Sequence, residues 1–254
     1  MKLSHALVRE PSPKFSAFYA ARGISISDSL ARAQHQAYVA ALRQVGLAVS
    51  VLPPHPIHHD CVFIEDTAIV WQGRALITNM NDVRNGEQRD VENWLADDFE
   101  IAHAPAGAKI EGGDVLHLDK LTLVGRSSRT NDAGIEALAE FMKPLGHLVQ
   151  AIDVKRCLHL KSGVAYLGNR TLLVAPELID LSIPGYAQIN VPPAESIAAN
   201  ALRINDHVLH AAGFNAVAKL IEKFAAANGL KLIGLEMSEL QKADGALTCQ
   251  SLLW

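Results

Sequence analysis

The sequence contains only three cysteines, Cys61, Cys157 and Cys249, which are far apart and form no CxxC pair. An odd number of widely separated cysteines argues against a disulfide framework and against a thiolate zinc site. No apolar run approaches the roughly 18 residues needed to span a bilayer. Charged residues and a proline at 9–11 interrupt the N-terminal stretch before a signal-peptide core forms. We therefore expect a cytoplasmic protein with no membrane contact.

Runs of Lys and Arg are also missing, and the formal net charge is −4. Without a basic patch there is nothing to hold a phosphate backbone, so nucleic acid is not an expected partner. The composition, with 49% hydrophobic and 20% charged residues, is that of a globular chain with a buried core. Because no Ser/Gly/Pro-rich linker divides it, we predict a single domain over residues 1–254.

Three stretches have the spacing of core-facing helices. The first begins after a cap at residue 27 or 28 and ends at Gly46, the second lies between Asn131 and Pro144, and the third ends at Gly229. The apolar positions expected to face the core are Leu30, Ala33, Ala37, Tyr38, Ala41, Leu42 and Val45 in the first, Ile135, Leu138, Phe141 and Met142 in the second, and Val217, Leu220, Ile221 and Phe224 in the third.

Between these helices, short apolar runs are joined in pairs by tight polar turns, which is typical of β-hairpins. The predicted pairs are 62–70 with 75–78, 115–118 with 121–124, 164–167 with 172–174, and 202–204 with 207–210. A fifth unit would pair the N-terminal strand at 6–8 with the C-terminal strand at 246–253. Five units of about 50 residues favour an α/β propeller of ββαβ repeats around a pseudo-fivefold axis. An open, doubly wound α/β sheet is the competing fold, but such sheets alternate single strands with helices.

Strongly polar residues recur where the first strand of each unit opens, in the segments DCVFIED, EGGD, HLKSG and LTCQS. In a propeller these openings would converge on the axis. Carboxylates, an imidazole and a thiol in a small volume perturb one another's pKa values, which is typical of a catalytic site. The residues concerned are Asp60, Glu65, Asp66, Glu111, Asp114, His159, Lys161 and Cys249.

Carboxylates at the axis indicate a cationic ligand, and a thiol attacks only as thiolate, which a nearby cation would stabilise. Either a protonated His159 or the substrate itself would supply that cation. A guanidinium group fits, because it is planar, carries five donors and is matched by carboxylates such as Asp66 and Glu111. The sequence therefore predicts attack of Cys249 on a guanidinium carbon.

The segments DCVFIED, EGGDVL, SSRTN, LHLKSG, ESIAAN and MSELQKADGALTCQS, in this order, resemble the dimethylarginine dimethylaminohydrolases of the pentein superfamily. The resemblance covers residues 51–251 and implies a five-bladed pentein fold. It also implies hydrolysis of mono- or dimethylarginine through a covalent thiouronium adduct, giving citrulline and a methylamine. It implies no metal and no organic cofactor.

The resemblance implies that Cys249 is the nucleophile, His159 the general acid/base, and Glu111 the residue that binds the guanidinium and orients the histidine. Arg84 and Arg129 would hold the α-carboxylate of the substrate. The implied substrate-binding set is Asp60, Phe63, Glu65, Asp66, Arg84, Arg129, Phe18 and Ala243, with Phe18 in the lid that precedes the first long helix.

Several alternatives stay open on the sequence. The same thiol and histidine would serve a hydrolase of unmethylated arginine or citrulline, or an amidinotransferase. Pentein folds also serve as ribosome-associated binding proteins without chemistry. Asp114 either acts directly or braces its loop. The segment His55, His58, His59, Asp60 has no regular ligand spacing, so surface histidines are expected there and not a metal. Whether the chain forms a homodimer is also open.

Overall fold

The β structure of the computed structural model, which describes residues 2–81 and 83–254, consists of five three-stranded sheets. In each sheet the middle strand pairs antiparallel with one neighbour and parallel with the other. The sheets are β15 (Ser251–Leu253), β1 (His5–Arg9) and β2 (Ala48–Leu52); β3 (Ala68–Trp71), β4 (Arg74–Ile77) and β5 (Glu100–His103); β6 (Val115–His117), β7 (Leu121–Arg126) and β8 (Leu148–Asp153); β9 (Val164–Gly168), β10 (Thr171–Val174) and β11 (Ala187–Asn190); and β12 (Leu202–Ile204), β13 (His207–Ala211) and β14 (Lys231–Leu235).

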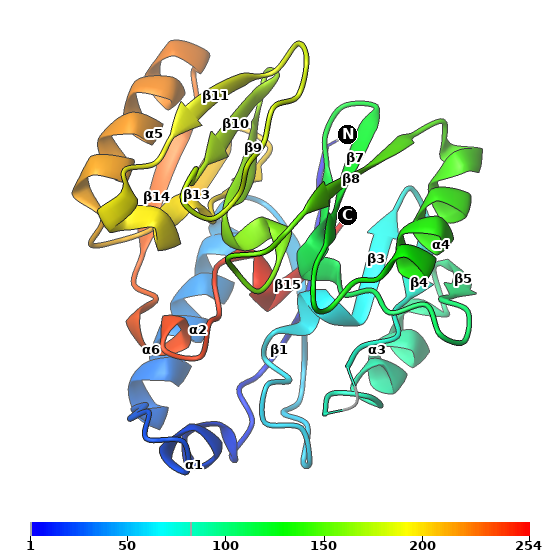
Figure 1. The fold of residues 1–254 in the computed structure, drawn as a ribbon. Coiled ribbons are helices and arrows are strands. Elements are labelled where there is room, and N and C mark those ends of the chain that lie inside the picture. Colours follow the sequence, from blue (N-terminus) through cyan, green and yellow to red (C-terminus); the bar gives the residue numbers. More distant parts are fainter. Residues whose placement is uncertain (1, 82) are drawn as a thin grey trace.

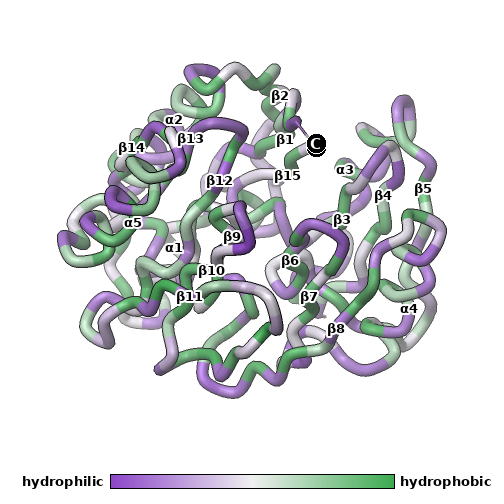
Figure 2. Tube along the Cα trace, turned by 90° about the horizontal axis from the view of Figure 1, so that it is seen from above, coloured by the Kyte–Doolittle hydropathy of each residue, from purple (hydrophilic) through white to green (hydrophobic). Residues whose placement is uncertain are grey.

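The sheets surround a common axis, with β15, β3, β6, β9 and β12 nearest to it (Figure 2). These strands line a central cavity of about 670 Å³. The terminal strands pair antiparallel, with Leu7 opposite Leu252, and so close the ring as the sequence predicts. The α/β propeller with five units is confirmed, and the open doubly wound sheet is wrong.

Four of the five units contain a helix between their second and third strands: α2 (Asp28–Gln44), α3 (Gln88–Leu95), α4 (Asp132–Met142) and α5 (Asn215–Asn228) (Figure 1). The predicted caps are confirmed for α2 and α4, since the side chain of Ser27 accepts from Leu30 N and that of Asn131 accepts from Gly134 N. Gly229 ends α5 in the left-handed conformation, where glycine has no steric penalty. Short helices α1 (Phe15–Ala20) and α6 (Ser238–Gln241) complete the described α-helices.

Two details of the predicted repeat are wrong. The unit of β9–β11 crosses from β10 to β11 through residues 175–186, which form no α-helix, so the ββαβ pattern is incomplete there. In α2, Leu30 is 44% exposed, and Ala33 and Ala37 are exposed too. The helix turns a partly polar stripe inward instead, because buried Gln34 and His35 find hydrogen-bond partners across the interface with the C-terminal segment.

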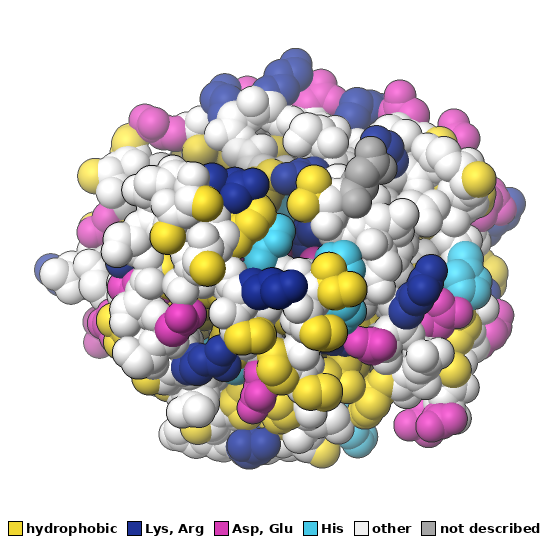
Figure 3. All heavy atoms as spheres, turned by 90° about the horizontal axis from the view of Figure 1, so that it is seen from below, with side chains coloured by type: hydrophobic (Ala, Val, Ile, Leu, Met, Phe, Trp, Pro, Cys, Tyr) yellow, Lys and Arg dark blue, Asp and Glu magenta, His cyan; other side chains and the backbone are white. Residues whose placement is uncertain are grey.

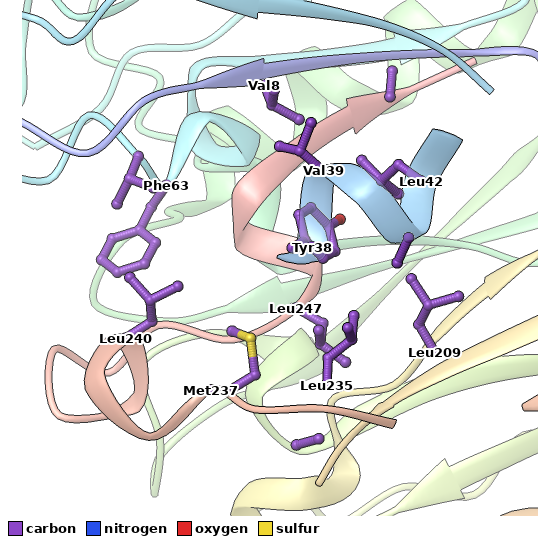
Figure 4. Packing of buried hydrophobic residues seen from close by; sticks show 14 of the residues in the cluster. Val8, Tyr38, Val39, Leu42, Phe63, Leu209, Leu235, Met237, Leu240 and Leu247 are labelled. Atoms are coloured by element: carbon purple, nitrogen blue, oxygen red, sulfur yellow. The ribbon is translucent and has the colours of Figure 1, made fainter. Parts of the chain in front are cut away.

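The largest core cluster lies between α2 and the last unit (Figure 4). Tyr38 is fully buried there, and its hydroxyl bonds with Ser251 Oγ at 2.7 Å. Leu235 and Met237 belong to the same cluster, as does Leu240, which lies beside Phe63, and all three come from the chain that leads to the C-terminus. This packing fixes residues 247–251 against a rigid helix. In the described residues, no helix is long and apolar enough to cross a membrane.

Candidate active site

The polar segments singled out in the sequence form 3-10 turns just before the innermost strands. They are Ile64–Thr67, Gly112–Asp114, Leu160–Ser162 and Thr248–Gln250. The strands predicted to start at 62 and 246 therefore begin later, at Ala68 and Ser251. In a strand, consecutive side chains point to opposite faces, whereas the turn buries both Glu65 and Asp66 near the axis. The turns therefore gather the polar groups at one end of the ring.

His159 and Glu111 form the central pair of this site. Nε2 of His159 donates to Oε2 of Glu111 at 2.8 Å, and both side chains are buried. Burial by itself would lower the pKa of His159, but Asp66, Glu111 and Asp114 together raise that pKa to about 9. Burial raises the pKa of Glu111, yet the bond to His159 and the charges near it dominate and bring that pKa to about 2. The pair is therefore an imidazolium and a carboxylate at neutral pH.

Glu111 is further held by Asn81, whose backbone N and side-chain Nδ2 donate to Oε1 at 3.2 and 2.9 Å. Nη1 of Arg129 lies 3.8 Å from the same oxygen, and the Arg129 side chain is 31% exposed. Arg129 thus stands between the buried pair and solvent. This position is compatible with the predicted contact to a substrate carboxylate.

Asp66 lies on the other side of the imidazole, with Oδ1 3.9 Å from His159 Nε2. Its Oδ1 accepts from the backbone N of Gly113 at 2.9 Å, and its Oδ2 pairs with Nη1 of Arg84 at 2.6 Å. Asp66 is therefore a fixed carboxylate, held at both oxygens and turned toward the histidine.

Arg84, which the resemblance assigns to the α-carboxylate of the substrate, is buried and paired with carboxylates of the protein itself. Besides Asp66, its guanidinium donates to both carboxylate oxygens of Glu87 and to the carbonyl of Phe63. The predicted contact to the α-carboxylate of a substrate would require Arg84 to leave these partners. The burial has a physical cause, because the carboxylates of Glu87 and Asp66 balance the charge of the guanidinium and, with the carbonyl of Phe63, accept from most of its N–H groups.

Cys249 lies in the Thr248–Gln250 turn and lines a cavity of about 740 Å³ together with His159 and Gly113. Glu65 and Lys161 form the inner wall of this cavity, and they also line the central cavity of the ring. Burial, with the charges of Glu65 and Asp66, raises the pKa of the Cys249 thiol to about 12. The thiol is therefore protonated at neutral pH. Figure 3 shows the molecule from below, with histidine, lysine and arginine side chains near the middle of that face.

The inner wall is an ion pair. Nζ of Lys161 contacts Oε1 of Glu65 at 2.5 Å, and Oε2 of Glu65 accepts from Thr248 Oγ1 at 2.9 Å. Glu65 thereby contacts the residue next to Cys249.

Asp114 does not face the Cys249 cavity in this way, since its carboxylate accepts hydrogen bonds from Ser127, Thr130 and the backbone N of Leu160. Between a direct role in the reaction and a role in bracing the loop, these hydrogen bonds favour bracing of the loop.

The other predicted substrate contacts lie around the lid. Phe18, in α1, stacks on the ring of His59, and the hydroxyl of Tyr19 donates to Asp60 at 2.9 Å and to the carbonyl of Ala243 at 3.4 Å. Phe63 is buried in the core, edge-on to Phe15 and against Gly245, where a Cβ would collide with its ring. Phe18, Asp60 and Ala243 are thus linked through Tyr19 and His59, but neither they nor Phe63 line the Cys249 cavity, and their contact with substrate stays a prediction.

Asp66, Glu111 and His159 also offer oxygen and nitrogen atoms within 4.8 Å of one another, the spacing of a metal site. The donor set fits a metal poorly. A protonated imidazole has no free lone pair for a cation, and Asp66 and Glu111 are already paired with Arg84 and His159. In the segment 55–60, His55 Nδ1 accepts from the backbone of Ile57 and His58, and His59 pairs with Asp60.

Gly113 leaves no room for a side chain beside the imidazole of His159. A Cβ on this residue would lie 2.6 Å from Nδ1 of His159. G113A should push the imidazole away from Glu111 and lower kcat by about 10²-fold, the typical cost of a misplacement near 1 Å. The measurement is kcat together with Tm. G234A is the matched control, because that glycine also faces a histidine, but with the nearest atom at 3.4 Å. Equal kcat in both variants contradicts the prediction.

The chain forms a ring of five sheets, and a thiol, an imidazolium and fixed carboxylates lie where the inner strands begin. With the solved structures that share this fold, these features place the chain in the pentein class of guanidine-modifying enzymes. A solved structure with this fold is that of dimethylarginine dimethylaminohydrolase from Pseudomonas aeruginosa, in a cysteine-to-serine mutant complexed with citrulline. It is 27% identical, with a TM-score of 0.91 and full coverage of both chains. The N-terminal domain of a cyanobacterial arginine dihydrolase has the same fold, with a TM-score of 0.84 at 21% identity.

The family described as N,N dimethylarginine dimethylhydrolase, eukaryotic, matches residues 14–184. Among the curated relatives, the N(G),N(G)-dimethylarginine dimethylaminohydrolase of Streptomyces coelicolor is 32% identical, over 99% of this chain and 97% of its own. That of Pseudomonas aeruginosa is 30% identical over 86% of each chain. The chain therefore belongs to the dimethylarginine dimethylaminohydrolase family and is a hydrolase of amidine C–N bonds.

Proposed function

We propose that the chain hydrolyses N-methylated arginine, as mono- or dimethylarginine, to citrulline and a methylamine through a thiouronium intermediate on Cys249. The carrying observation is the buried pair of His159 and Glu111 in the turns beside the Cys249 cavity. Relatives named as dimethylarginine dimethylaminohydrolases, one of them solved with citrulline, support the substrate class.

The charge of the site favours a cation. The buried carboxyl groups outnumber the cations there. The carboxyl groups are Glu65, Asp66, Glu87, Glu111 and Asp114, and the cations are the buried Arg84 and His159, the half-buried Lys161 and the partly exposed Arg129. A guanidinium entering this field gains Coulomb energy that a neutral ligand does not. Its positive charge also opposes the groups that raise the pKa of Cys249, so substrate binding promotes formation of the thiolate.

In the first step, Sγ of Cys249 forms a bond to the guanidinium carbon, and the bond from that carbon to the methylated nitrogen breaks. The imidazolium of His159 gives its proton to the departing amine. In the second step, the neutral imidazole takes a proton from water and the hydroxide adds to the thiouronium carbon. The bond from that carbon to Sγ then breaks, the thiolate leaves, and the new hydroxyl group gives its proton to solvent, which leaves citrulline. Glu111 stabilises the imidazolium in both steps through the bond to Nε2.

The pH dependence follows from these two groups. The reactive form has a deprotonated thiol and a protonated imidazole, with pKa values of about 12 for Cys249 and about 9 for His159. Below pH 9 the imidazole is already protonated, so kcat/KM rises with pH as the thiol loses its proton. Above pH 9 the gain in thiolate is cancelled by the loss of imidazolium. We expect kcat/KM to rise tenfold per pH unit and to level off near pH 9.

E111Q should move this break to lower pH, because Asp66 and Asp114 remain but the hydrogen bond and charge of Glu111, which also raise the pKa of His159, are removed. The measurement is kcat/KM against pH for wild type and variant. E100Q is the control, since Glu100 is an exposed carboxylate paired with Arg74. A break that stays in place in E111Q would show that His159 is not the group observed.

Substrate identity is tested by mass spectrometry of the products from asymmetric dimethylarginine, monomethylarginine, arginine and citrulline, each offered separately. Citrulline and dimethylamine from the first compound support the proposal. Faster turnover of unmethylated arginine would indicate that the protein is an arginine hydrolase. A product that appears only when a second amine is added would indicate an amidinotransferase. If all four compounds survive, the proposed substrate class is wrong.

A further inference from the structure

Asn200 makes a set of contacts that no step of the proposed reaction uses. It follows the 3-10 segment Pro193–Ala199, is separated from β12 by Ala201, and is only 3% exposed. Its neighbours in the sequence, Ala198, Ala199 and Ala201, are also buried, and a polar residue is unusual in such a buried segment. A buried amide is costly unless its donors and acceptor are satisfied.

All polar atoms of this side chain are used. Nδ2 of Asn200 donates to the carbonyl of Lys161 at 2.9 Å and to Oγ1 of Thr248 at 3.0 Å, and Oδ1 accepts from the backbone N of Thr248 at 3.1 Å. Thr248 directly precedes Cys249, and Lys161 is in the turn that follows His159. One side chain therefore ties the turn of the thiol to the turn of the imidazole.

The same two turns are joined a second time through Glu65. One oxygen of its carboxylate accepts a hydrogen bond from Nζ of Lys161, and the other accepts from Oγ1 of Thr248. Asn200, Lys161, Glu65 and Thr248 thus form a closed ring of hydrogen bonds, here called the polar ring. All four residues border either the cavity of Cys249 or the central cavity. Within the polar ring, Asn200 bonds to backbone atoms of both turns and so fixes main chain, not only side chains.

We infer that Asn200 is a positioning residue that sets the relative placement of Cys249 and His159. This inference rests on the proposed roles of those two residues. An amide is the side chain that fits, since it offers two donor hydrogens and an acceptor at one point. An aspartate has the acceptor for Thr248 N but no donor for Lys161 O, and it would add a negative charge near Glu65.

The test compares N200A, N200D and wild type for Tm, for kcat and KM with asymmetric dimethylarginine, and for the rate at which a haloacetamidine alkylates Cys249. We expect N200A to lower kcat by about 10²-fold, with KM changed less than about threefold and with slower alkylation. N200D should also fail to restore kcat, whatever its Tm, because the donor to Lys161 is absent.

N205A is the matched control. Asn205 also uses both ends of its amide, bonding to the N and O of Leu3 at 2.9 Å, but it lies in the turn between β12 and β13. N205A should lower Tm and leave kcat unchanged. A wild-type kcat in N200A at reduced Tm would show that Asn200 is merely structural and would overturn the inference.

T248V keeps the inference falsifiable if N200A does not fold. This substitution removes the hydroxyl shared by Asn200 and Glu65 but retains the backbone bond from Thr248 N to Asn200. We expect a smaller kcat loss in the same direction, and an unchanged kcat would contradict the inference. Failure of the proposed function is seen instead in the wild type, as no turnover and no alkylation of Cys249, and it would overturn both.

Discussion

Replacement of Cys249 by serine should lower kcat by roughly 10⁴-fold or more, the scale of loss when a group is removed from a catalytic unit. The hydroxyl of serine has a far higher pKa than a thiol, and this site already raises the pKa of the thiol through burial, Glu65 and Asp66. The cation that helps a thiolate to form is therefore insufficient for an alkoxide. The measurement is release of dimethylamine and citrulline from asymmetric dimethylarginine.

The fold should tolerate this change, because Ser and Cys differ little in volume and residues 250 and 251 are held by α2 through His35 and Tyr38. An unchanged Tm accompanies the expected loss. C61S is the control. Cys61 is buried, contacts the backbone of His55 and Glu10, and keeps both contacts as a serine. Activity of C249S within tenfold of wild type would contradict the role of Cys249 as nucleophile.

Replacement of His159 by alanine should lower kcat with dimethylarginine by about 10²–10⁴-fold, the usual contribution of a general acid/base. Without the imidazolium, no proton reaches the departing dimethylamine. The variant also leaves Glu111 and Asp66 without the cation between them. The carboxylates then repel each other, and the pKa of Glu111, which His159 helps to lower, should rise.

A substrate analogue separates the two steps. In an S-alkyl-thiocitrulline the departing group is a thiolate, which needs no proton in order to leave. H159A should therefore form the thiouronium adduct from this analogue at a rate within about tenfold of wild type, while hydrolysis of the adduct stays slow. Adduct accumulation is followed by intact-protein mass spectrometry. An equal loss with both substrates would indicate that His159 only shapes the pocket.

Local signals in the sequence predict much of the fold. Ser27, Asn131 and Gly229 mark helix ends by their own capping chemistry, which depends on few neighbours. The hairpins are predicted because each apolar pair is joined by a tight turn, as at Gln72, whose φ is +48°. Helix α3 has no such signal. Its only buried apolar residues are Val91 and Leu95, so its sequence is typical of a polar loop.

The candidate site divides in the same way. Glu111, His159 and Cys249 stand at equivalent strand openings, and the propeller brings those openings together. The burial of Arg84 and the contacts of Asn200 were not predictable, because their partners come from other units of the ring. From the sequence alone, Arg84 is an ordinary loop arginine and Asn200 an ordinary asparagine. Only the folded structure shows that Asp66 is the partner of the first, and Lys161 and Thr248 the partners of the second. Long-range polar networks are thus the part that sequence pattern does not reveal.

Acid quenching during turnover tests most directly whether a covalent adduct forms on Cys249. The enzyme is mixed with asymmetric dimethylarginine or monomethylarginine, quenched, digested and analysed by mass spectrometry. Because the methyl groups depart with the amine, we predict one and the same added mass from both substrates, on the peptide that carries Cys249. Turnover with no adduct on that peptide, or with different masses from the two substrates, would contradict the account.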